Sequence, residues 1–548
     1  MGRRSLQEKL RTRAGMAVVL AAVALFAVAM YLPATRFNFV WDDASLITGH
    51  GARDQGPGFW TPTSDSRLPS PAYYRPLVTL SFRLDRMLSR TNAHWFHFVN
   101  VLLFALAAAA VTLVLWELLH SGVWALLGGL LFTAHSSHVE TVAYVSGRTD
   151  IMLTLLTALA AFVLLRSFRK RNRWWRLAVP PMFGLALLSK ETAVMFPLLV
   201  ALTPLLVGVR YDRRYWWLVL ASLAVLAGYL LLHVAAVRSP IPLAIQAGFG
   251  RRLLAAANTF GLYIRMFFWP LAHRVRYPAS NVFFTLTPNL LLALLFAVSV
   301  PLLSLQRRFT ATLWGYAWTI AFLLPVLSIA TPGPLAAERL LCLPSAGMVM
   351  VLVTVLSRLL TFRITARKVV GIGLAAIVLF LAVDTMVRSR IWRNDETLFT
   401  AMVREAPDAP TAYAGLADAI AAQRPDSALA LYNHALRLDQ GYVHAYVNSA
   451  RLLSERGDHR RAIHQFRLAR DLDPNSAMVL NDLGVAFTEA GEPDSALATF
   501  AYAVAKYPNS HTLRLNYANS LSAAGRTEEA NAELRSAAAL DSAAQNRR

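Results

Sequence analysis

Long apolar runs separated by short polar or basic segments fill the first part of the chain. Inside a hydrocarbon layer about 30 Å thick, a chain that crosses repeatedly has to be helical, because backbone polar groups find no other partners there. The pattern predicts an all-α membrane bundle of about 11 transmembrane helices within residues 1–393. The runs are Ala14–Pro33, Phe96–Leu119, Val123–Ala134, Ile151–Leu165, Leu177–Leu188, Ala193–Val209, Trp216–Val237, Asn289–Leu305, Ala311–Ile329, Leu343–Leu360 and Val369–Val387.

From Thr411 onward the pattern changes to short amphipathic helices with a period of 34 residues. The recurring positions are Gly457, Gly491 and Gly525, Ala462, Ala496 and Ala530, and Pro474 and Pro508. This is the period of the tetratricopeptide repeat, in which small residues let two helices pack closely and the proline starts the next unit. We expect a linker at residues 394–410 and about four repeats over residues 411–548, as a helical solenoid that either binds peptides or proteins or serves as a spacer or dimerisation element. The expected units are Thr411–Asp439, Tyr442–Asp473, Ser476–Tyr507 and Ser510–Asp541.

Composition supports a membrane protein and removes several other classes. Hydrophobic residues make up 56% of the chain and charged residues 16%, with a mean hydropathy of +0.43, which is too apolar for an ordinary soluble protein. The net charge of +22 is spread as short clusters between apolar runs, without an aromatic and basic platform, so we expect no nucleic-acid partner. The single cysteine, Cys342, excludes an intrachain disulfide and a site with several cysteine ligands.

Basic clusters set the orientation of the bundle. They lie at the N-terminus and at Arg166–Arg176, Arg210–Arg214, Arg307–Arg308 and Arg358–Lys368. All of them become cytoplasmic if the first run is an uncleaved anchor and Arg251–His273, which mixes arginines with aromatic residues, lies at the interface instead of crossing. An odd number of crossings then places the repeats outside the cytoplasm.

Polar residues are costly in a membrane region, so their position carries functional information. Under this topology they gather in the outer loops, whereas the inner loops hold mainly arginine and lysine. A mixture of carboxylates and cations at one face is typical of a site where cations bind a phosphate and a carboxylate acts as a base. The clusters are Trp41–Asp43, Tyr73–Pro76, His135–Glu140, Gly147–Asp150, Ser189–Glu191 and Glu338–Arg339.

Several clusters also have a structural interpretation. An Asp42–Asp43 pair after a helix is often a solvated turn or a helix cap, although its place among the other clusters favours a functional role. Lys190 lies in a tight turn between two apolar runs, where extension of its side chain to the membrane surface explains it as well as phosphate binding does. Arg75, between a tyrosine and a proline, is a further candidate for a phosphate contact, although this short motif is not specific to phosphate binding.

The histidine cluster leaves two roles open. His135 and His138, with Glu140 beyond them, fit either part of a metal site or residues that organise the loop through hydrogen bonds. The spacing assigns no third ligand, so a divalent metal is possible but not supported. Glu338 and Arg339 either belong to the site or pair with each other as a structural ion pair.

These motifs, in this order, resemble the transmembrane and tetratricopeptide repeat-containing O-mannosyltransferases (the TMTC family) and their bacterial relatives. The matching elements are WDD at Trp41–Asp43, YYRP at Tyr73–Pro76, HSSHVETVAYVSGRTD at His135–Asp150, LLSKE at Leu187–Glu191, ERLLCLPS at Glu338–Ser345 and the repeat tail. Two positions depart from the family pattern, Ser136 where proline is usual and Leu340 where tyrosine is usual. Both departures leave the charged positions in place.

The resemblance implies the GT-C glycosyltransferase fold. It also implies a polyprenyl-phosphate donor whose sugar, mannose or a similar one, is transferred to an acceptor outside the cytoplasm. It implies that Asp42 or Asp43 is the catalytic base and that a cation stabilises the lipid-phosphate leaving group. The cations considered are Arg75, Arg148, Lys190 and Arg339, and the further substrate-binding candidates are Asp150, Glu191 and Glu338.

Three functions follow from these observations. The first is transfer of a sugar to serine or threonine of a protein that the repeats recruit. The second keeps the fold and transfers the sugar to an envelope glycan or lipid, and the third is a membrane-anchored scaffold without activity. Transport fits less well, because the middles of the apolar runs are almost free of ionisable residues. The Ala- and Arg-rich composition and the lack of a retention signal at Arg548 favour a bacterial inner membrane with periplasmic repeats, or an endoplasmic reticulum membrane with luminal repeats if the protein is eukaryotic.

Overall fold

The computed structural model describes most of the chain as α-helix and divides it into two compact units, Met1–Leu398 and Phe399–Arg548. The described residues are 12–48, 74–170, 173–208, 213–236, 248–277, 285–304, 310–327, 336–359 and 364–545. They contain no β-strand, which agrees with the predicted all-α class. The basic N-terminus, Tyr73, Arg210, the pair Arg307–Arg308 and Arg548 lie outside them.

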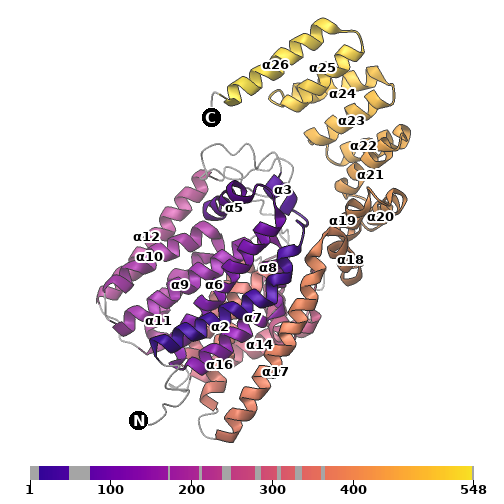
Figure 1. Ribbon diagram of the computed structural model, residues 1–548. Helices are drawn as coiled ribbons and strands as arrows, with labels where there is room; N and C mark the ends of the chain where they lie inside the picture. The colour runs from indigo at the N-terminus through magenta and orange to yellow at the C-terminus, as the bar shows by residue number, and fades with distance from the viewer. Residues whose placement is uncertain are drawn as a thin grey trace. The chain divides into compact units, whose positions relative to one another are not determined.

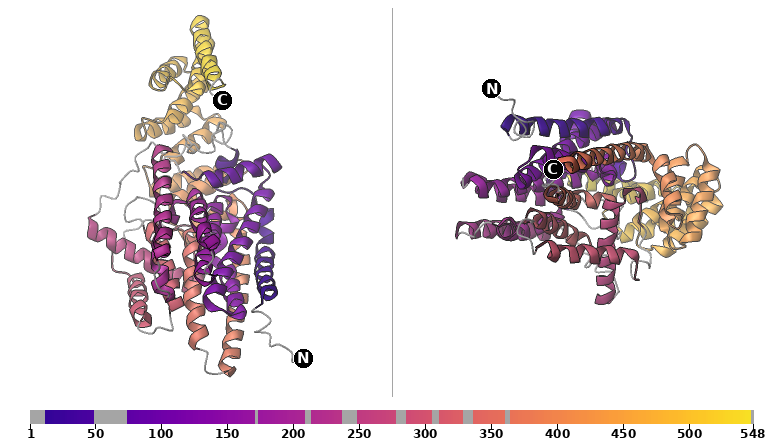
Figure 2. Two further views of the ribbon diagram at one scale, coloured as in Figure 1. Left: turned by 90° about the vertical axis from the view of Figure 1, so that its left-hand side faces the viewer. Right: turned by 90° about the horizontal axis from the view of Figure 1, so that it is seen from below.

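The first unit is a bundle of helices that run side by side (Figures 1 and 2). Its central layer is α6, α9 and α10, with α2 and α7 against α6 and with α12 against α10. The helices are α2 (Arg13–Tyr31), α3 (Asp43–Thr48), α5 (Pro76–Ser89), α6 (Ala93–Leu119), α7 (Gly122–Ala134), α8 (Val139–Ala143), α9 (Arg148–Lys170), α10 (Arg173–Ser189), α11 (Phe196–Val207), α12 (Arg213–Ala236), α13 (Phe249–Phe268), α14 (Pro288–Ser304), α15 (Thr310–Leu323), α16 (Cys342–Leu359) and α17 (Ile364–Ser389). Short 3-10 turns connect several of them, including η1 (Leu32–Arg36), η2 (Ser136–His138), η3 (Val145–Gly147), η4 (Glu191–Met195), η5 (Pro270–Ala272), η8 (Leu324–Val326), η9 (Glu338–Leu341) and η10 (Arg390–Arg393).

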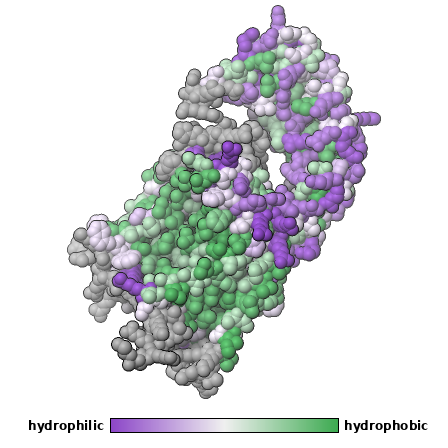
Figure 3. All heavy atoms as spheres, in the orientation of Figure 1, coloured by the Kyte–Doolittle hydropathy of each residue, from purple (hydrophilic) through white to green (hydrophobic). Residues whose placement is uncertain are grey.

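Both the core and the outer surface of this bundle are apolar. Leucine, valine and phenylalanine side chains on α2, α12, α14 and α17 are exposed. Figure 3 shows hydrophobic residues over most of the visible face of the first unit. A water-soluble domain rarely exposes so large an apolar surface, so this one fits a bilayer as solvent.

Six described helical segments are long and apolar enough to cross a membrane, which indicates an integral membrane protein. Each of the predicted runs falls on a described helix, but not every such helix has the length of a span. Gly122–Ala134, for example, has 13 residues and extends over roughly 20 Å at 1.5 Å per residue, short of the hydrocarbon thickness. The six segments are Arg13–Arg36, Ala93–Leu119, Val145–Phe168, Tyr215–Ala236, Glu338–Arg358 and Val369–Arg393. The shorter apolar helices are Gly122–Ala134, Glu191–Val207, Pro288–Ser299 and Ala311–Val326.

The segment predicted to lie at the interface, Arg251–His273, forms most of α13 and the turn η5. Helix α13 is absent from the six candidate spans among the described residues. It buries one face, including Tyr263 and Phe267, and exposes Phe249 and Phe268.

The second unit is built of antiparallel helix pairs that stack in sequence order (Figure 1). Each of the four predicted units coincides with one pair, because each carries two short amphipathic stretches separated by a turn. The segment 394–410, expected as a linker, contains a further helix, α18 (Asp395–Glu405). The pairs are α19 (Pro410–Ile420) with α20 (Pro425–Leu438), α21 (Val443–Glu455) with α22 (His459–Leu472), α23 (Ala477–Glu489) with α24 (Pro493–Lys506), and α25 (His511–Ala523) with α26 (Thr527–Gln545).

The periodic glycines and alanines have different roles in these pairs. Gly457, Gly491 and Gly525 end the first helix of a pair with φ between +74° and +79°, and no atom lies within 4 Å of the place where a Cβ would be. The expectation that they allow close helix packing is therefore wrong, since their function is the left-handed turn. The periodic alanines are fully buried and do allow close packing, as does Gly484 against Phe500.

Candidate active site

Asp43 organises two loops at one end of the bundle. Its carboxylate accepts hydrogen bonds from the backbone N–H groups of Val145 (3.2 Å) and Ser146 (2.9 Å), from the Ser146 hydroxyl (2.8 Å), and from the N–H of Val40 (3.4 Å). The side chain is fully buried. Burial raises the pKa of Asp43 to about 7, although the four donors favour the charged form. Asp43 thus ties the first loop to the turn η3 before α9.

The neighbouring Asp42 is exposed, in contrast to Asp43. Its Oδ2 accepts a hydrogen bond from the hydroxyl of Tyr144 (3.5 Å), whose ring packs against Trp392 at 5.5 Å. Partial burial raises the pKa of Asp42 above the ordinary carboxyl value, while the charge of Arg339 and the Tyr144 hydrogen bond act in the opposite direction. Of the two predicted bases, Asp42 is the one that a substrate can reach.

The backbone of this first loop is held in a strained shape. Trp41, directly before Asp42, has φ +54°, which is uncommon for a residue with a side chain. Its N–H donates to Oδ1 of Asp395 (2.8 Å), and the N–H of Asn38 donates to the carbonyl of Arg393 (3.0 Å). The chain that follows α17 therefore fixes the loop that carries Asp42. No sequence pattern predicts this pairing, since Trp41 and Asp395 are 354 residues apart.

Arg148 lies within the bundle and is not available to a substrate. Its side chain is fully buried, forms an ion pair with Asp85, and lies 4.5 Å from the ring centre of Phe82. Its Nε donates to Oδ1 of Asn100 (2.7 Å). The Asn100 side-chain amide in turn donates to the backbone carbonyls of Tyr144 and Val145, at the start of η3. The expectation that Arg148 contacts a lipid phosphate does not fit this position. Its contacts support the loop that Asp43 binds.

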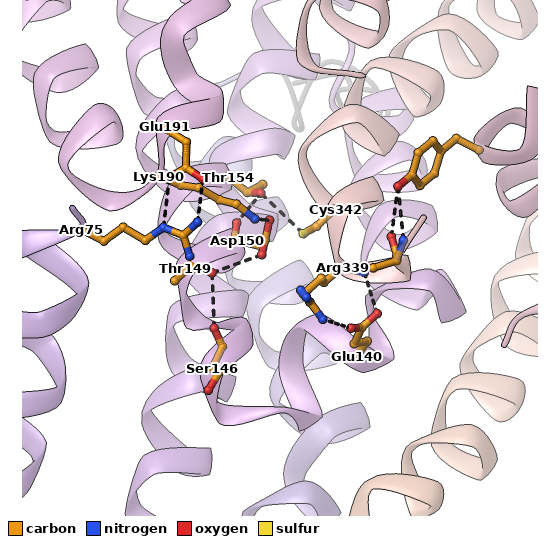
Figure 4. A network of polar contacts seen from close by, with 12 residues as sticks. Arg75, Glu140, Ser146, Thr149, Asp150, Thr154, Lys190, Glu191, Arg339 and Cys342 are labelled. Carbon is orange, nitrogen blue, oxygen red and sulfur yellow. Dashed lines mark hydrogen bonds and ion pairs between the residues drawn. The ribbon is translucent and has the colours of Figure 1, made fainter. Parts of the chain in front are cut away.

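Two further ion pairs lie next to each other in the network of Figure 4. The ammonium of Lys190 is 2.6 Å from Oδ1 of Asp150, and both side chains are buried. Arg75 binds Glu191 in a two-pronged pair, with Nη2 to Oε1 at 2.6 Å and Nε to Oε2 at 3.1 Å. Arg75 and Glu191 keep 19% and 39% of their side-chain surface exposed. The predicted substrate-binding residues thus meet here, with Arg75 more accessible than Lys190.

Glu338 and Arg339 do not pair with each other, which corrects the structural alternative considered from the sequence. They are neighbours in η9, so their side chains point to different elements. Arg339 binds Glu140 through its guanidinium and through its backbone N–H (3.0 Å). Glu338 accepts from Nη2 of Arg388 (2.6 Å) at the end of α17. Both pairs join the loop before α16 to the rest of the site.

The two histidines lie between α7 and α8, and each has a hydrogen-bond partner that is distant in the sequence. Nδ1 of His135 accepts from the backbone N–H of Ser137 (3.3 Å), so Nε2 donates to the carbonyl of Phe267 (2.9 Å). Nε2 of His138 lies 2.9 Å from Oγ of Ser345. Burial lowers the pKa of His135 to about 4, which keeps the ring neutral. Among the described residues, no group of three His, Cys, Asp or Glu side chains is arranged to hold a metal ion, and these contacts are those of loop-organising residues.

Sequence reasoning named the charged loop residues but missed their partners. Asn100 is a polar residue inside a long apolar run. Because burying a polar side chain in a membrane is costly, its position could have indicated a role in the site. Asp85, Tyr144, Arg388 and Asp395 gave none, because each acquires its role only through a neighbour distant in sequence.

Comparison with known proteins finds similarity in two separate segments of the chain. The family model described as dolichyl-phosphate-mannose-protein mannosyltransferase matches residues 86–239, and two models described as tetratricopeptide repeat match residues 447–511 and 487–545. The protein O-mannosyl-transferase Tmtc1 of Drosophila melanogaster is 35% identical over 197 residues, which are 34% of this chain and 23% of the fly protein. A protein O-mannosyl-transferase of Caenorhabditis elegans is 26% identical over 436 residues, 74% of this chain and 60% of that protein.

The chain is a distant homologue of the TMTC protein O-mannosyltransferases. It combines a mannosyltransferase-type membrane segment with tetratricopeptide repeats, as the resemblance in the motifs predicted. The aligned part spans less than a quarter of the length of the fly relatives. Arg148, Asp150, Lys190 and Glu191 lie within the matched mannosyltransferase segment, whereas Asp42 lies before it.

The repeat unit also has a counterpart among solved structures. A crystal structure of YrrB, described as a tetratricopeptide repeat protein with an unusual peptide-binding site, is 22% identical. The alignment covers 26% of this chain and 74% of that one, with a TM-score of 0.24.

Proposed function

We propose that this protein is a membrane mannosyltransferase. It takes a mannosyl group from a polyprenyl-phosphate donor and passes it to a hydroxyl group of an acceptor, serine or threonine of a protein, on the non-cytoplasmic side. The observation that carries the proposal is one exposed carboxylate, Asp42, at the same end of the bundle as a network of paired cations and carboxylates. The similarity of residues 86–239 to a mannosyltransferase family supports the choice of sugar and donor.

Asp42 is the catalytic base in this proposal. The acceptor hydroxyl gives its proton to the Asp42 carboxylate as its oxygen attacks the anomeric carbon of the donor. The new bond to the acceptor oxygen forms while the bond from that carbon to the phosphate oxygen breaks, and the polyprenyl phosphate leaves with the electron pair. Asp43 is unsuited to this step, because its carboxylate is buried under four hydrogen bonds from its own chain.

The burial and position of each cation suggest its role in this proposal. Arg339 lies near Asp42 and helps to keep that carboxylate charged. Arg75 is a partly exposed cation at the other side of the network and would hold the phosphate, since an arginine matches two phosphate oxygens at once. Asp150 and Lys190 are buried together between the two and would fix the distance from base to phosphate.

The topology completes the proposal. If the helices α7, α10, α11, α14 and α15 cross together with the six longer segments, the chain crosses the membrane 11 times, and the repeats lie on the side of Asp42. We assign that side to the periplasm of a bacterial inner membrane, or to the endoplasmic reticulum lumen in a eukaryote. Short helices can serve as spans in a bundle where neighbours cover their ends.

Sugar transfer in native membranes tests the function. A panel of radiolabelled polyprenyl-phosphate sugars is offered to wild type, Asp42→Asn and Asp43→Asn, with protein level and thermal stability measured for each. Removing a general base should slow transfer about 100-fold or more without loss of stability, so Asp42→Asn should be inactive but folded. Asp43→Asn should lower the thermal stability first. Transfer by Asp42→Asn at the wild-type rate would exclude Asp42 as the base.

The acceptor is tested separately. Deletion of residues 411–548 should reduce transfer to protein while leaving transfer to a small glycan unchanged, if the repeats position the acceptor. Equal transfer to protein by both forms would show that the repeats do not position a protein acceptor, and transfer to the glycan without transfer to protein would favour a glycan or lipid acceptor. Absence of transfer from every donor by every form would favour a membrane-anchored scaffold.

A further inference from the structure

Near the C-terminal end of α12, two buried polar groups have no hydrogen-bond partner among the residues that the structure describes. The hydroxyl of Tyr229 is one of them, in a side chain only 5% exposed, and Nδ1 of His233 is the other. The two residues are four apart and lie on one face of the helix, with ring centres 5.8 Å apart. Buried polar groups without a partner are destabilising, so a pair on one face needs an explanation.

The two side chains lie beside Tyr74, the residue next to the partly exposed Arg75. The ring of Tyr74 lies 6.3 Å from the ring of Tyr229 and 6.3 Å from that of His233. Arg75 follows directly in the chain, and Tyr229 interacts electrostatically with Arg75 and with its partner Glu191. We call Tyr74, Arg75, Tyr229 and His233 the Tyr229 cluster. It offers a cation, a hydroxyl donor and an imidazole in one place.

The same turns of α12 are strongly apolar on the outside. Leu230, Leu231, Leu232 and Val234 are all exposed, at 47% to 74% of their surface. They lie between and next to Tyr229 and His233 in the sequence but on the opposite side of the helix. Helix α12 therefore carries a polar inner face and an apolar outer face. A ligand that fits both faces has an anionic head and a long hydrocarbon chain.

We propose that the Tyr229 cluster binds the phosphate of the polyprenyl carrier, with the hydrocarbon chain lying along the leucine face of α12. Tyr229 and His233 donate hydrogen bonds to the phosphate oxygens, and Arg75 balances their charge. The inference rests on the proposed function, because it names the place where that function's donor is held. Ordinary phospholipids offer the same phosphate chemistry, and the test separates the two sources.

Binding is measured without transfer, on the full-length protein in nanodiscs. The probe is a polyprenyl phosphate without sugar that carries a photoreactive diazirine, and the compared forms are wild type, Tyr229→Phe and Tyr215→Phe. Tyr215 is the matched control, since it is a buried tyrosine on the same helix that packs against Phe168 at the other end. The loss of one hydrogen bond to a charged oxygen should raise the half-saturating probe concentration about tenfold for Tyr229→Phe, and leave Tyr215→Phe unchanged.

Stability separates binding from a structural role. Without the probe, Tyr229→Phe should be as thermally stable as wild type or more stable, because the lost hydroxyl has no hydrogen-bond partner among the described residues. Unchanged labelling of Tyr229→Phe would overturn the proposal, as would competition by phosphatidylglycerol equal to that by unlabelled polyprenyl phosphate. Labelling that depends on Tyr229 in a protein that transfers no sugar would refute the mannosyltransferase function and leave the phosphate site standing.

Discussion

Replacing Asp395 by alanine tests whether the segment after α17 holds the loop that carries the proposed base, Asp42. The substitution removes the acceptor of the Trp41 N–H, a contact of 2.8 Å to a charged oxygen. The loop would then keep the strained backbone of Trp41, at φ +54°, without the hydrogen bond that secures it. Because Asp42 is the next residue, release of Trp41 should displace the base.

The size of the effect follows from the hydrogen bond. A bond to a charged partner contributes about 1.5–3 kcal/mol, and the lower value applies here because Asp395 is partly exposed. A loss of about 1.5 kcal/mol lowers the ratio of held to released loop roughly tenfold. The rate of sugar transfer at saturating donor should therefore fall by up to about tenfold, with little change in the donor concentration needed for half the maximal rate.

Hydrogen exchange detected by mass spectrometry follows the loop directly. In Asp395→Ala, the peptide that contains Trp41 should exchange faster than in wild type. Asp395→Asn keeps an acceptor oxygen and should restore most of the protection. Glu396→Ala is the matched control, since it removes a carboxylate from the same first turn of α18 at an exposed position. Exchange and transfer in Asp395→Ala within twofold of the Glu396→Ala values would refute the reasoning.

Three further predictions follow from the site and the repeats. Asp85→Ala leaves a buried arginine without its counter-charge and should lower the free energy of unfolding by about 3–5 kcal/mol, seen as a lower melting temperature in detergent; a melting temperature equal to wild type contradicts it. The proposed base must be charged and the pKa of Asp42 is raised, so kcat/KM should fall on acidification already above the ordinary carboxyl range near pH 4. Tyr144→Phe removes a donor that lowers this pKa and should therefore move the fall to higher pH. A pH profile that does not move argues against Asp42 as the base. Gly484→Ala would place a Cβ 2.6 Å from the ring of Phe500 and should destabilise the repeats by about 1–3 kcal/mol, measured by limited proteolysis of the second unit; unchanged proteolysis would show that the ring moves aside.

The sequence by itself determined the class and the order of the parts. Apolar runs of membrane length require helices, because lipid offers no partner for the backbone, and the 34-residue period requires stacked helix pairs. Both are local properties, so they can be read along the chain. The motifs around Asp42, Asp150 and Arg339 were also local, and their order resembled a known family. The length of each helix was less certain, since a short run such as Gly122–Ala134 becomes part of the bundle only through its neighbours.

Which charged residues are buried and which are exposed depends on the tertiary structure. Asp42 and Asp43 are adjacent and chemically equal in the sequence, but folding covers Asp43 with donors from a loop about 100 residues later and leaves Asp42 exposed. Arg75 and Arg148 are likewise equal as candidates until one is found accessible and the other buried against Asp85. Burial and ion pairing depend on segments that meet only in the folded chain. Their effect on charge is therefore not readable from local pattern.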